Sequence, residues 1–363
     1  MSKYLLIGAA LAFSSLSARA EVQFKGDFRF RNEEIKEEQA GAIPTGDRFR
    51  ERVRLRAGAS AKVNEKTDVT FRLATGSLTN TDNTSTNQDL GDYYAKKQIE
   101  LDMAYFNYKA SETVQILGGK TPIYFNSAGA ADIVFDTDLT PEGLALKYKS
   151  VGDGPEYFGN LGVSWLSERY SATGATDNTD VGLVGAQAGV TFKPENYTVL
   201  LQFSQYNFSN IKGSTAISAK GNTLVGGAYA QGYNLSAFDA EIGSTLLGLP
   251  CSLYYEMVSN ADGGKYKNAA VVGIKLGKMK DVGSWTFIID NREVEKDAVV
   301  GVLTDSDSSG GGTDIRSTRF VGAYQIAENS NIGLTWMNGK KSISSTAFSP
   351  NYTRAMLDFN FNF

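Results

Sequence analysis

Five arginines occupy alternate positions in one run of the sequence: Arg48, Arg50, Arg52, Arg54 and Arg56. Guanidinium groups are permanently charged, so such a row can pair with carboxylates or bias the passage of ions. A helix has a period of 3.6 residues and would spread the row around its circumference, whereas a β-strand puts alternate residues on one face. We therefore predict a strand with one basic face and one mainly apolar face.

Neighbouring runs extend the basic face. Arg29 and Arg31 alternate with phenylalanines, and Arg72 lies between Phe71 and Leu73. On the lipid side of a membrane barrel each arginine would cost about 2–4 kcal/mol, so the row would cancel a typical folding stability of about 5–15 kcal/mol. In a membrane these arginines must therefore line the interior.

Few catalytic arrangements are open to this chain, because it contains no histidine and a single cysteine, Cys251. Ser-His and Cys-His nucleophile systems and histidine metal sites are thereby excluded. An enzyme that uses only carboxylates is the remaining catalytic hypothesis, and no motif supports it. We expect a protein that is not an enzyme and that binds no cofactor.

The long stretch at 121–143 carries four carboxylates: Asp132, Asp136, Asp138 and Glu142. If this loop folds into a barrel, its carboxylates would face the arginine row across a constriction and create a transverse field. The alternative is a solvated acidic loop on the surface. We predict the inward fold.

Glu100 and Asp102 are two positions apart on a predicted strand and could be read as a catalytic pair of carboxylates. We expect them instead to balance the arginines across the lumen. Strict alternation places four residues on the opposite face of the same strand: Ile99, Leu101, Met103 and Tyr105.

The stretch 303–314 resembles a calcium-binding loop, with Asp305, Asp307 and Asp314 as candidate ligands. No suitably spaced bidentate Glu follows, and Gly, Asp and Ser are ordinary turn residues. We predict a solvated loop and no metal site.

The first twenty residues have the features of an export signal. Lys3 precedes an apolar run, and Ala18-Arg19-Ala20 matches a signal-peptidase pattern, so we expect residues 1–20 to be removed. Loss of Lys3 and Arg19 reduces the basic residues from 36 to 34 against 40 acidic ones, a net charge of −6. This balance does not suit a nucleic-acid partner.

After residue 20 no apolar stretch approaches the length of a membrane-spanning helix.

Alternating strands continue to the end of the chain, separated by short turns and long polar loops. Short turns are predicted at 64–67, 110–113, 193–196, 246–250, 278–283 and 327–331. Long loops are predicted near 33–47, 76–96, 122–141, 170–180, 207–230, 261–267, 302–315 and 339–352. About sixteen strands result, an even number as in bacterial barrels. The stretch 221–234 could be another strand. An odd number of strands would place the two termini on opposite sides of the membrane, so we assign most of this stretch to the preceding loop.

A soluble sandwich shares this alternation, but other features favour a barrel. Short turns at one end and long loops at the other are typical of outer-membrane barrels. Small residues such as Ala57 and Ala59 on apolar faces would leave voids in a sandwich. We predict one all-β domain over residues 21–363: a transmembrane antiparallel β-barrel with short periplasmic turns and long extracellular loops.

The last strand carries three alternating phenylalanines: Phe359, Phe361 and Phe363. A terminal aromatic on an alternating strand resembles the signal that the outer-membrane barrel assembly machinery recognises. The alternative is an ordinary amphipathic edge strand. We predict an assembly signal.

Segments along the whole mature chain resemble the bacterial "putative porin" family. They are GDFRFR (26–31), RFRERVRLRAG (48–58), GGKTP (118–122), GLPCSLYYEMVSN (248–260), LTDSDSSGGGTD (303–314) and the Phe-ended last strand. The resemblance implies a porin-like outer-membrane barrel, trimeric as general porins are, with an inward loop between the fifth and sixth strands.

Two hypotheses from different classes follow. The chain is either a passive diffusion porin, in which the arginine row and the acidic loop filter ions and small hydrophilic solutes, or a structural or adhesive barrel with a plugged lumen. Both place it in the bacterial outer membrane, with lipid, lipopolysaccharide and the assembly machinery as partners. The basic wall and the acidic loop act in opposite directions on ion selectivity, and their geometry decides which dominates.

Overall fold

The computed structural model describes residues 21–38, 47–76, 83–170 and 179–363. The expected signal peptide, residues 1–20, lies outside the described residues, as do parts of three predicted long loops. Within the described ranges the fold is all-β, apart from a single 3₁₀ turn at Ser308–Gly310. No helix in those ranges is long and apolar enough to cross a membrane.

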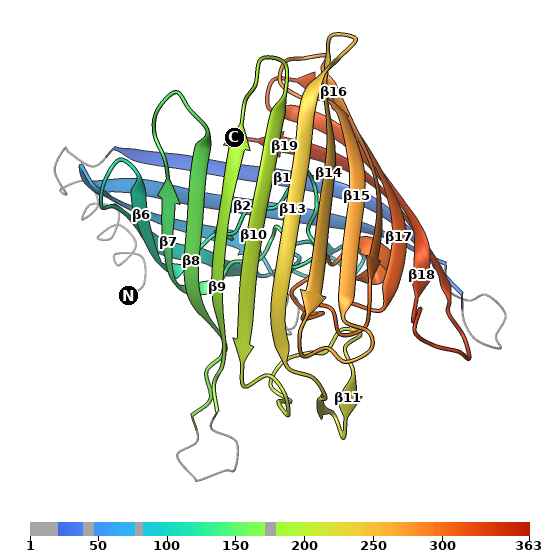
Figure 1. Ribbon diagram of the computed structural model, residues 1–363. Coiled ribbons are helices and arrows are strands. Elements are labelled where there is room, and N and C mark those ends of the chain that lie inside the picture. Colours follow the sequence, from blue (N-terminus) through green and yellow to red (C-terminus); the bar gives the residue numbers. More distant parts are fainter. Residues whose placement is uncertain (1–20, 39–46, 77–82, 171–178) are drawn as a thin grey trace, which may run out of the picture.

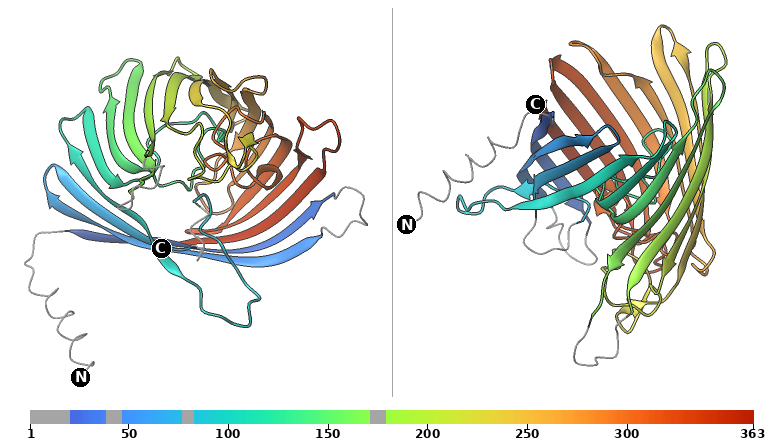
Figure 2. Two further views of the ribbon diagram at one scale, coloured as in Figure 1. Left: turned by 90° about the horizontal axis from the view of Figure 1, so that it is seen from below. Right: turned by 90° about the vertical axis from the view of Figure 1, so that its left-hand side faces the viewer.

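Sixteen strands of the described chain form one closed antiparallel barrel (Figures 1 and 2). They are β1 (Val22–Glu37), β2 (Arg48–Asn64), β3 (Thr67–Thr75), β5 (Ile99–Lys109), β6 (Val114–Lys120), β7 (Glu142–Lys149), β8 (Glu156–Ser167), β9 (Val181–Phe192), β10 (Thr198–Ser209), β13 (Tyr233–Leu246), β14 (Leu249–Asn260), β15 (Asn268–Gly277), β16 (Trp285–Val294), β17 (Ile315–Ala327), β18 (Ser330–Lys341) and β19 (Asn351–Asn362). The short β4 (Gln88–Asp89) adds to β2, and β11 (Leu224–Val225) pairs with β12 (Ala228–Tyr229) in a separate hairpin.

The first and last strands close the ring. β1 pairs with β2 on one side and with β19 on the other. Gly26 and Phe363 exchange two backbone hydrogen bonds, of 2.7 and 3.0 Å between nitrogen and oxygen. Phe28 lies opposite Phe361 across this seam, with ring centroids 6.2 Å apart. A closed ring leaves no unpaired strand edge, which a lipid environment requires.

Turn length separates the two ends of the barrel, as predicted. β13 and β14 are joined by two residues, 247–248, whereas the loops at the other end include 210–232 and 295–314. These long loops lie at the lower end in Figure 1. β13 begins at Tyr233, which confirms that most of 221–234 belongs to the preceding loop.

The two faces of each strand differ in the way that a barrel in lipid requires. On β2, Phe49 is 70% exposed on the outer surface, whereas Arg52, on the other face, is 7% exposed. Val69, Phe71 and Leu73 of β3 are likewise exposed on the outside. The predicted alternation of β2 and β3 is therefore present, with the apolar side outward.

Strict alternation fails on β5. Arg72 pairs in register with Met103 but Leu73 pairs with Leu101, so Asp102 is an extra residue in the ladder. Such a bulge reverses the face of the residues that follow it. Ile99 and Leu101 point outward, 58% and 55% exposed, while Tyr105 packs against the apolar cluster inside the barrel. The prediction that these three residues share a face was wrong.

The barrel is not an empty tube. A buried apolar cluster inside it includes Phe125, Ile133, Tyr206, Leu235 and Val299. The cluster as a whole comes from inward strand faces and from the loops at 121–141, 210–232 and 295–314, and the 210–232 loop contributes Ile211 and Tyr229. Figure 2 (left), seen from the long-loop end, shows these loops within the ring of strands.

Candidate channel constriction

Residues 121–141, which we call the crossing segment, join β6 to β7 and contact strands around much of the barrel. Near its start, the amides of Gln187 on β9 and Gln202 on β10 donate to the carbonyl oxygen of Asn126, both at 2.9 Å. The backbone nitrogen of Gly129 then donates to Glu241 of β13 at 2.8 Å. These contacts hold the segment away from the strands that it connects.

Two aromatic rings fix the first part of the crossing segment against glycines of the wall. Phe125 lies against Tyr206 of β10, with ring centroids 4.9 Å apart. A Cβ added to Gly162 of β8 would lie 2.1 Å from the Tyr124 ring, and one added to Gly185 of β9 would lie 2.3 Å from the Phe125 ring. Glycine at these two positions therefore makes the space that the rings occupy.

The second part of the crossing segment carries the predicted acidic residues, which have different partners. Asp138 lies 3.2 Å from Arg56, measured from Oδ1 to Nη1, and 3.9 Å from the Nη1 atom of Arg54. Asp132 pairs instead with Arg292 of β16, at 2.5 Å, and with Arg319 of β17, at 3.5 Å. Among the described residues, Asp138 is thus the predicted loop carboxylate that reaches the arginine row.

The remaining two predicted carboxylates lie elsewhere. Asp136 accepts hydrogen bonds from the backbone nitrogens of Asp138, at 2.8 Å, and of Ser306, at 3.0 Å. Burial, reinforced by the charge of Asp305, raises the pKa of Asp136 to about 8. Glu142 is the first residue of β7 and pairs with Lys120 at 2.8 Å. It does not face the arginine row.

The arginine row itself is paired along its length. Arg54 and Arg56 both contact Asp27 of β1, at 2.8 and 2.7 Å. Further contacts of the predicted basic residues include Arg48–Asp89, Arg50–Asp89, Arg50–Glu33, Arg52–Asp89, Arg52–Glu33, Arg29–Asn87, Arg31–Asp358, Arg31–Asp307 and Arg72–Asp102. The row therefore binds protein carboxylates rather than presenting bare charges to the lumen.

β4 brings Asp89 onto this row from the loop between β3 and β5. Asp89 pairs in register with Arg52 on β2, so its side chain lies over the same face as the guanidinium groups. Burial alone would raise the pKa of Asp89, but Arg52 and Arg50 outweigh burial and hold the pKa below its usual value. Asp89 therefore stays ionised and couples this loop to the wall.

The loop at 295–314 uses its aspartates for internal ion pairs. Asp305 lies 2.8 Å from Arg292, and Asp307 lies 2.9 Å from Arg354. Burial raises the pKa of Asp305, whereas Arg354 and Arg31 outweigh burial and lower the pKa of Asp307. Asp314 accepts from the backbone nitrogen and hydroxyl of Ser344, both at 2.8 Å. The expectation of a solvated loop was wrong, because much of this loop is buried.

Sequence reasoning missed several residues of this network. Asp27 and Glu33 continue the alternation of Arg29 and Arg31 on β1, so the spacing could have identified them as partners of the row. Arg292, Arg319 and Arg354 lie on three different strands, and no run of alternating arginines marks them in the sequence.

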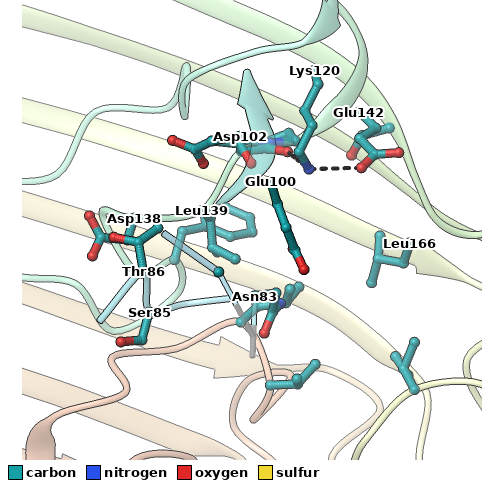
Figure 3. A pocket seen from close by; sticks show the side chains of 18 of the residues that line it. Asn83, Ser85, Thr86, Glu100, Asp102, Lys120, Asp138, Leu139, Glu142 and Leu166 are labelled. Carbon is teal, nitrogen blue, oxygen red and sulfur yellow. Dashed lines mark hydrogen bonds and ion pairs between the residues drawn. The ribbon is translucent and has the colours of Figure 1, made fainter. Parts of the chain in front are cut away.

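A cavity of about 460 Å³ lies between the inner wall from β3 to β9 and the loops that fill the rest of the barrel (Figure 3). Its wall side includes Glu100, Asp102, Lys120 and Glu142, and its loop side includes Asp138 and Leu139. The loop side also includes Asn83, Ser85 and Thr86 and residues 216–218 and 302–303. In the described chain no group of three His, Cys, Asp or Glu side chains is arranged to hold a metal ion.

A closed sixteen-strand barrel with an apolar exterior, charged side chains on its inner wall and a cavity between wall and inward loops defines the class of outer-membrane β-barrels. The sequence matches the family described as "Putative porin" over residues 42–226 and 228–363, and the chain belongs to this family. No curated protein matches the chain at a significant level.

Solved structures of outer-membrane proteins share the fold. The high-pH structure of OprB from Pseudomonas putida aligns with a TM-score of 0.61 at 12% identity, covering 94% of each chain. OmpF of Salmonella typhi, in complex with daunomycin, aligns with a TM-score of 0.56 at 11% identity, covering 94% of this chain and 97% of that one. The outer-membrane channel DcaP of Acinetobacter baumannii aligns with a TM-score of 0.51 at 14% identity, covering 96% of this chain and 99% of that one. The protein is a bacterial outer-membrane β-barrel of the porin type.

Proposed function

We propose that this protein is a passive diffusion porin for ions and small hydrophilic solutes, and that it makes or breaks no covalent bond. In this proposal water and solutes pass between the inner wall from β3 to β9 and the crossing segment. The arginine row and the carboxylates of the crossing segment form the filter.

One observation carries the proposal: Asp138 of the crossing segment pairs with Arg56 of β2 beside the cavity. An ion pair between a wall and an inward loop fixes the width of the opening and sets opposite charges on its rim. The partners of the other arginines, such as Asp27 and Asp89, neutralise most of the basic charge. The cavity lining in the described chain then has four carboxylates, at Glu100, Asp102, Asp138 and Glu142, and one ammonium, at Lys120.

We therefore propose a preference for cations. Asp102 and Asp138 have arginine partners and Glu142 has Lys120, so within the described ranges Glu100 is the lining carboxylate without a basic partner. Within the row, Arg54 and Arg56 hold Asp138 at the edge of the cavity.

A plugged structural barrel is the second candidate. The observation that supports it is the tight packing of the long loops inside the barrel. Ala298, Val299 and Val300 of the 295–314 loop are at most 1% exposed inside the barrel. Asn222 donates to the carbonyl oxygens of Lys296 and Val299, both at 2.8 Å, and so joins this loop to the 210–232 loop. These loops close part of the lumen.

Conductance distinguishes the two candidates. Residues 21–363, refolded in detergent and inserted into a planar bilayer under a salt gradient, should give stable current steps with a reversal potential of the sign for cations. A folded barrel that passes no steady current would favour the plugged alternative. A reversal potential of the opposite sign would contradict the proposed cation preference.

We further propose that the barrel forms a homotrimer in lipid and lipopolysaccharide, and that Phe359, Phe361 and Phe363 direct its assembly. The resemblance to general porins supports the trimer, and the pairing of the last strand with β1 is consistent with a role in closing the barrel. Native mass spectrometry of the unheated protein should give three chains per particle. Deletion of Phe363 should reduce the amount of folded barrel in the outer membrane.

A further inference from the structure

We propose that the cavity beside the crossing segment is a binding subsite for organic cations with an apolar body, and that Glu100 contacts the cationic group. This inference rests on the proposed channel function, because solutes would reach the cavity through the barrel. It adds a substrate class to that function.

Glu100 differs from the other charged residues of the cavity. Asp102, Asp138 and Glu142 each have a basic partner, whereas no basic side chain among the described residues pairs with Glu100. Figure 3 shows the Glu100 side chain extending into the cavity, away from Lys120 and Glu142. An ionised carboxylate in this position attracts a positive group and repels an anion.

The bulge on β5 explains why Glu100 faces inward. Tyr105 points inward, and strict alternation back from it would turn Glu100 outward. Because Asp102 is an extra residue, the pattern shifts by one position, so Leu101 points outward and Glu100 inward. Bulges are frequent next to functional sites, where they redirect a side chain.

A second bulge supplies an apolar wall to the same cavity. On β8, Trp165 pairs with Gly182 and Ser167 pairs with Val181, so Leu166 is an extra residue. Trp165 is 52% exposed on the outside, whereas Leu166 lies beside the inner apolar cluster and lines the cavity. Leu139 of the crossing segment lines it as well, and Figure 3 shows Glu100 between these two leucines.

The basic residues nearby do not offer a matching site for anions. Lys120 is held by Glu142 at 2.8 Å and by the carbonyl oxygen of Thr140 at 3.3 Å. Arg54 and Arg56 contact Asp27 and Asp138. The volume of about 460 Å³ is in the range of pockets that bind small organic molecules, roughly 300–1,000 Å³. An ammonium group with an aromatic or alkyl body matches both the charge and the apolar wall.

Block of the potassium chloride current in a planar bilayer tests the subsite, with benzyltrimethylammonium as the probe. The wild-type channel should show concentration-dependent block, and Glu100→Gln should weaken the block by about tenfold, as expected for the loss of one charge-assisted contact. Glu112→Gln, in the short turn at the far end of β5, is the matched control and should leave the block unchanged. Leu166→Ala should weaken block by benzyltrimethylammonium more than block by tetramethylammonium.

Two results would overturn the subsite while leaving the porin function intact: equal block of wild type and Glu100→Gln, or equally strong block by benzenesulfonate. A wild-type barrel without current would instead contradict the proposed porin function. In that case calorimetric titration of the detergent-solubilised barrel with benzyltrimethylammonium tests the subsite without a current. Glu100→Gln should still weaken binding, and an affinity equal to that of the wild type would overturn the subsite.

Discussion

Asp138 and Arg56 are 82 positions apart in the sequence, and the Oδ1 atom of one lies 3.2 Å from the Nη1 atom of the other. This pair joins the crossing segment to the second strand of the barrel. Because Arg56 also contacts Asp27 of β1, at 2.7 Å, the pair is part of a network that spans two strands and an inward loop. Changes to either partner should therefore alter both the position of the crossing segment and the charge of the path.

Replacement of Arg50, Arg52 and Arg54 with alanine should shift ion selectivity further towards cations. The substitution removes three positive charges and leaves Glu33, Asp27 and Asp89 less compensated. The reversal potential under a salt gradient measures the shift. The matched control replaces the same arginines with lysine, which keeps the charges. Identical reversal potentials for the alanine variant and the wild type would contradict a role of the row in selectivity.

The variant Asp138→Asn should act in the opposite direction. Loss of this carboxylate leaves Arg56 with less compensation at the edge of the cavity, so selectivity should move towards anions. Asp153→Asn, in the exposed turn between β7 and β8, is the matched control. A shift of equal size in the control would show that total charge, rather than position, governs selectivity.

Alanine at Gly162 should destabilise the barrel by about 1–3 kcal/mol, the usual cost of overpacking. Its Cβ would lie 2.1 Å from the Tyr124 ring, so the anchor of the crossing segment must move. Gly159→Ala on the same strand is the control, because the nearest atom to its Cβ would be 3.6 Å away. The temperature at which the folded band disappears on a gel measures the difference, and equal temperatures for both variants would count against this anchor.

The raised pKa of Asp136 predicts a pH dependence of stability. Burial and Asp305 raise the pKa from 3.8 to about 8, so the folded state favours the protonated form. Protonated Asp136 therefore stabilises the folded state relative to ionised Asp136. This contribution is fully present below about pH 4, decreases as the pH rises above the unfolded pKa and is lost above about pH 8. Asp136→Asn cannot ionise, so its melting temperature relative to wild type should rise between pH 5 and pH 9. A difference that stays constant over that range would contradict the prediction.

Local periodicity was sufficient to predict most of the barrel. The alternation of Arg48 to Arg56 with apolar residues defined β2, and turn residues such as 64–67 located the strand ends. A bulge shifts the pattern by one residue and has no clear signature in a single sequence, so the inward position of Tyr105 was not predicted.

The partners of the candidate site were harder to predict than the strands. Asp138 was predicted to face the arginine row, but Asp132 was not predicted to contact Arg292, 160 positions away. Such contacts depend on how three long loops pack inside the barrel, and that packing is not encoded in any local spacing. The burial of the loop at 295–314 was missed for the same reason, because its Gly, Asp and Ser residues are those of an exposed turn.

Cysteine modification tests most directly whether the water path runs through the cavity. Ser218 lies on an exposed part of the 210–232 loop and lines the cavity, so Ser218→Cys is made in a Cys251→Ser background. The current through single barrels is recorded while a water-soluble trimethylammonium-ethyl methanethiosulfonate is added. We predict a stepwise decrease in current for Ser218→Cys and no change for the Cys251→Ser parent. An unchanged current, with mass spectrometry confirming that Cys at position 218 has reacted, would contradict a path through this cavity.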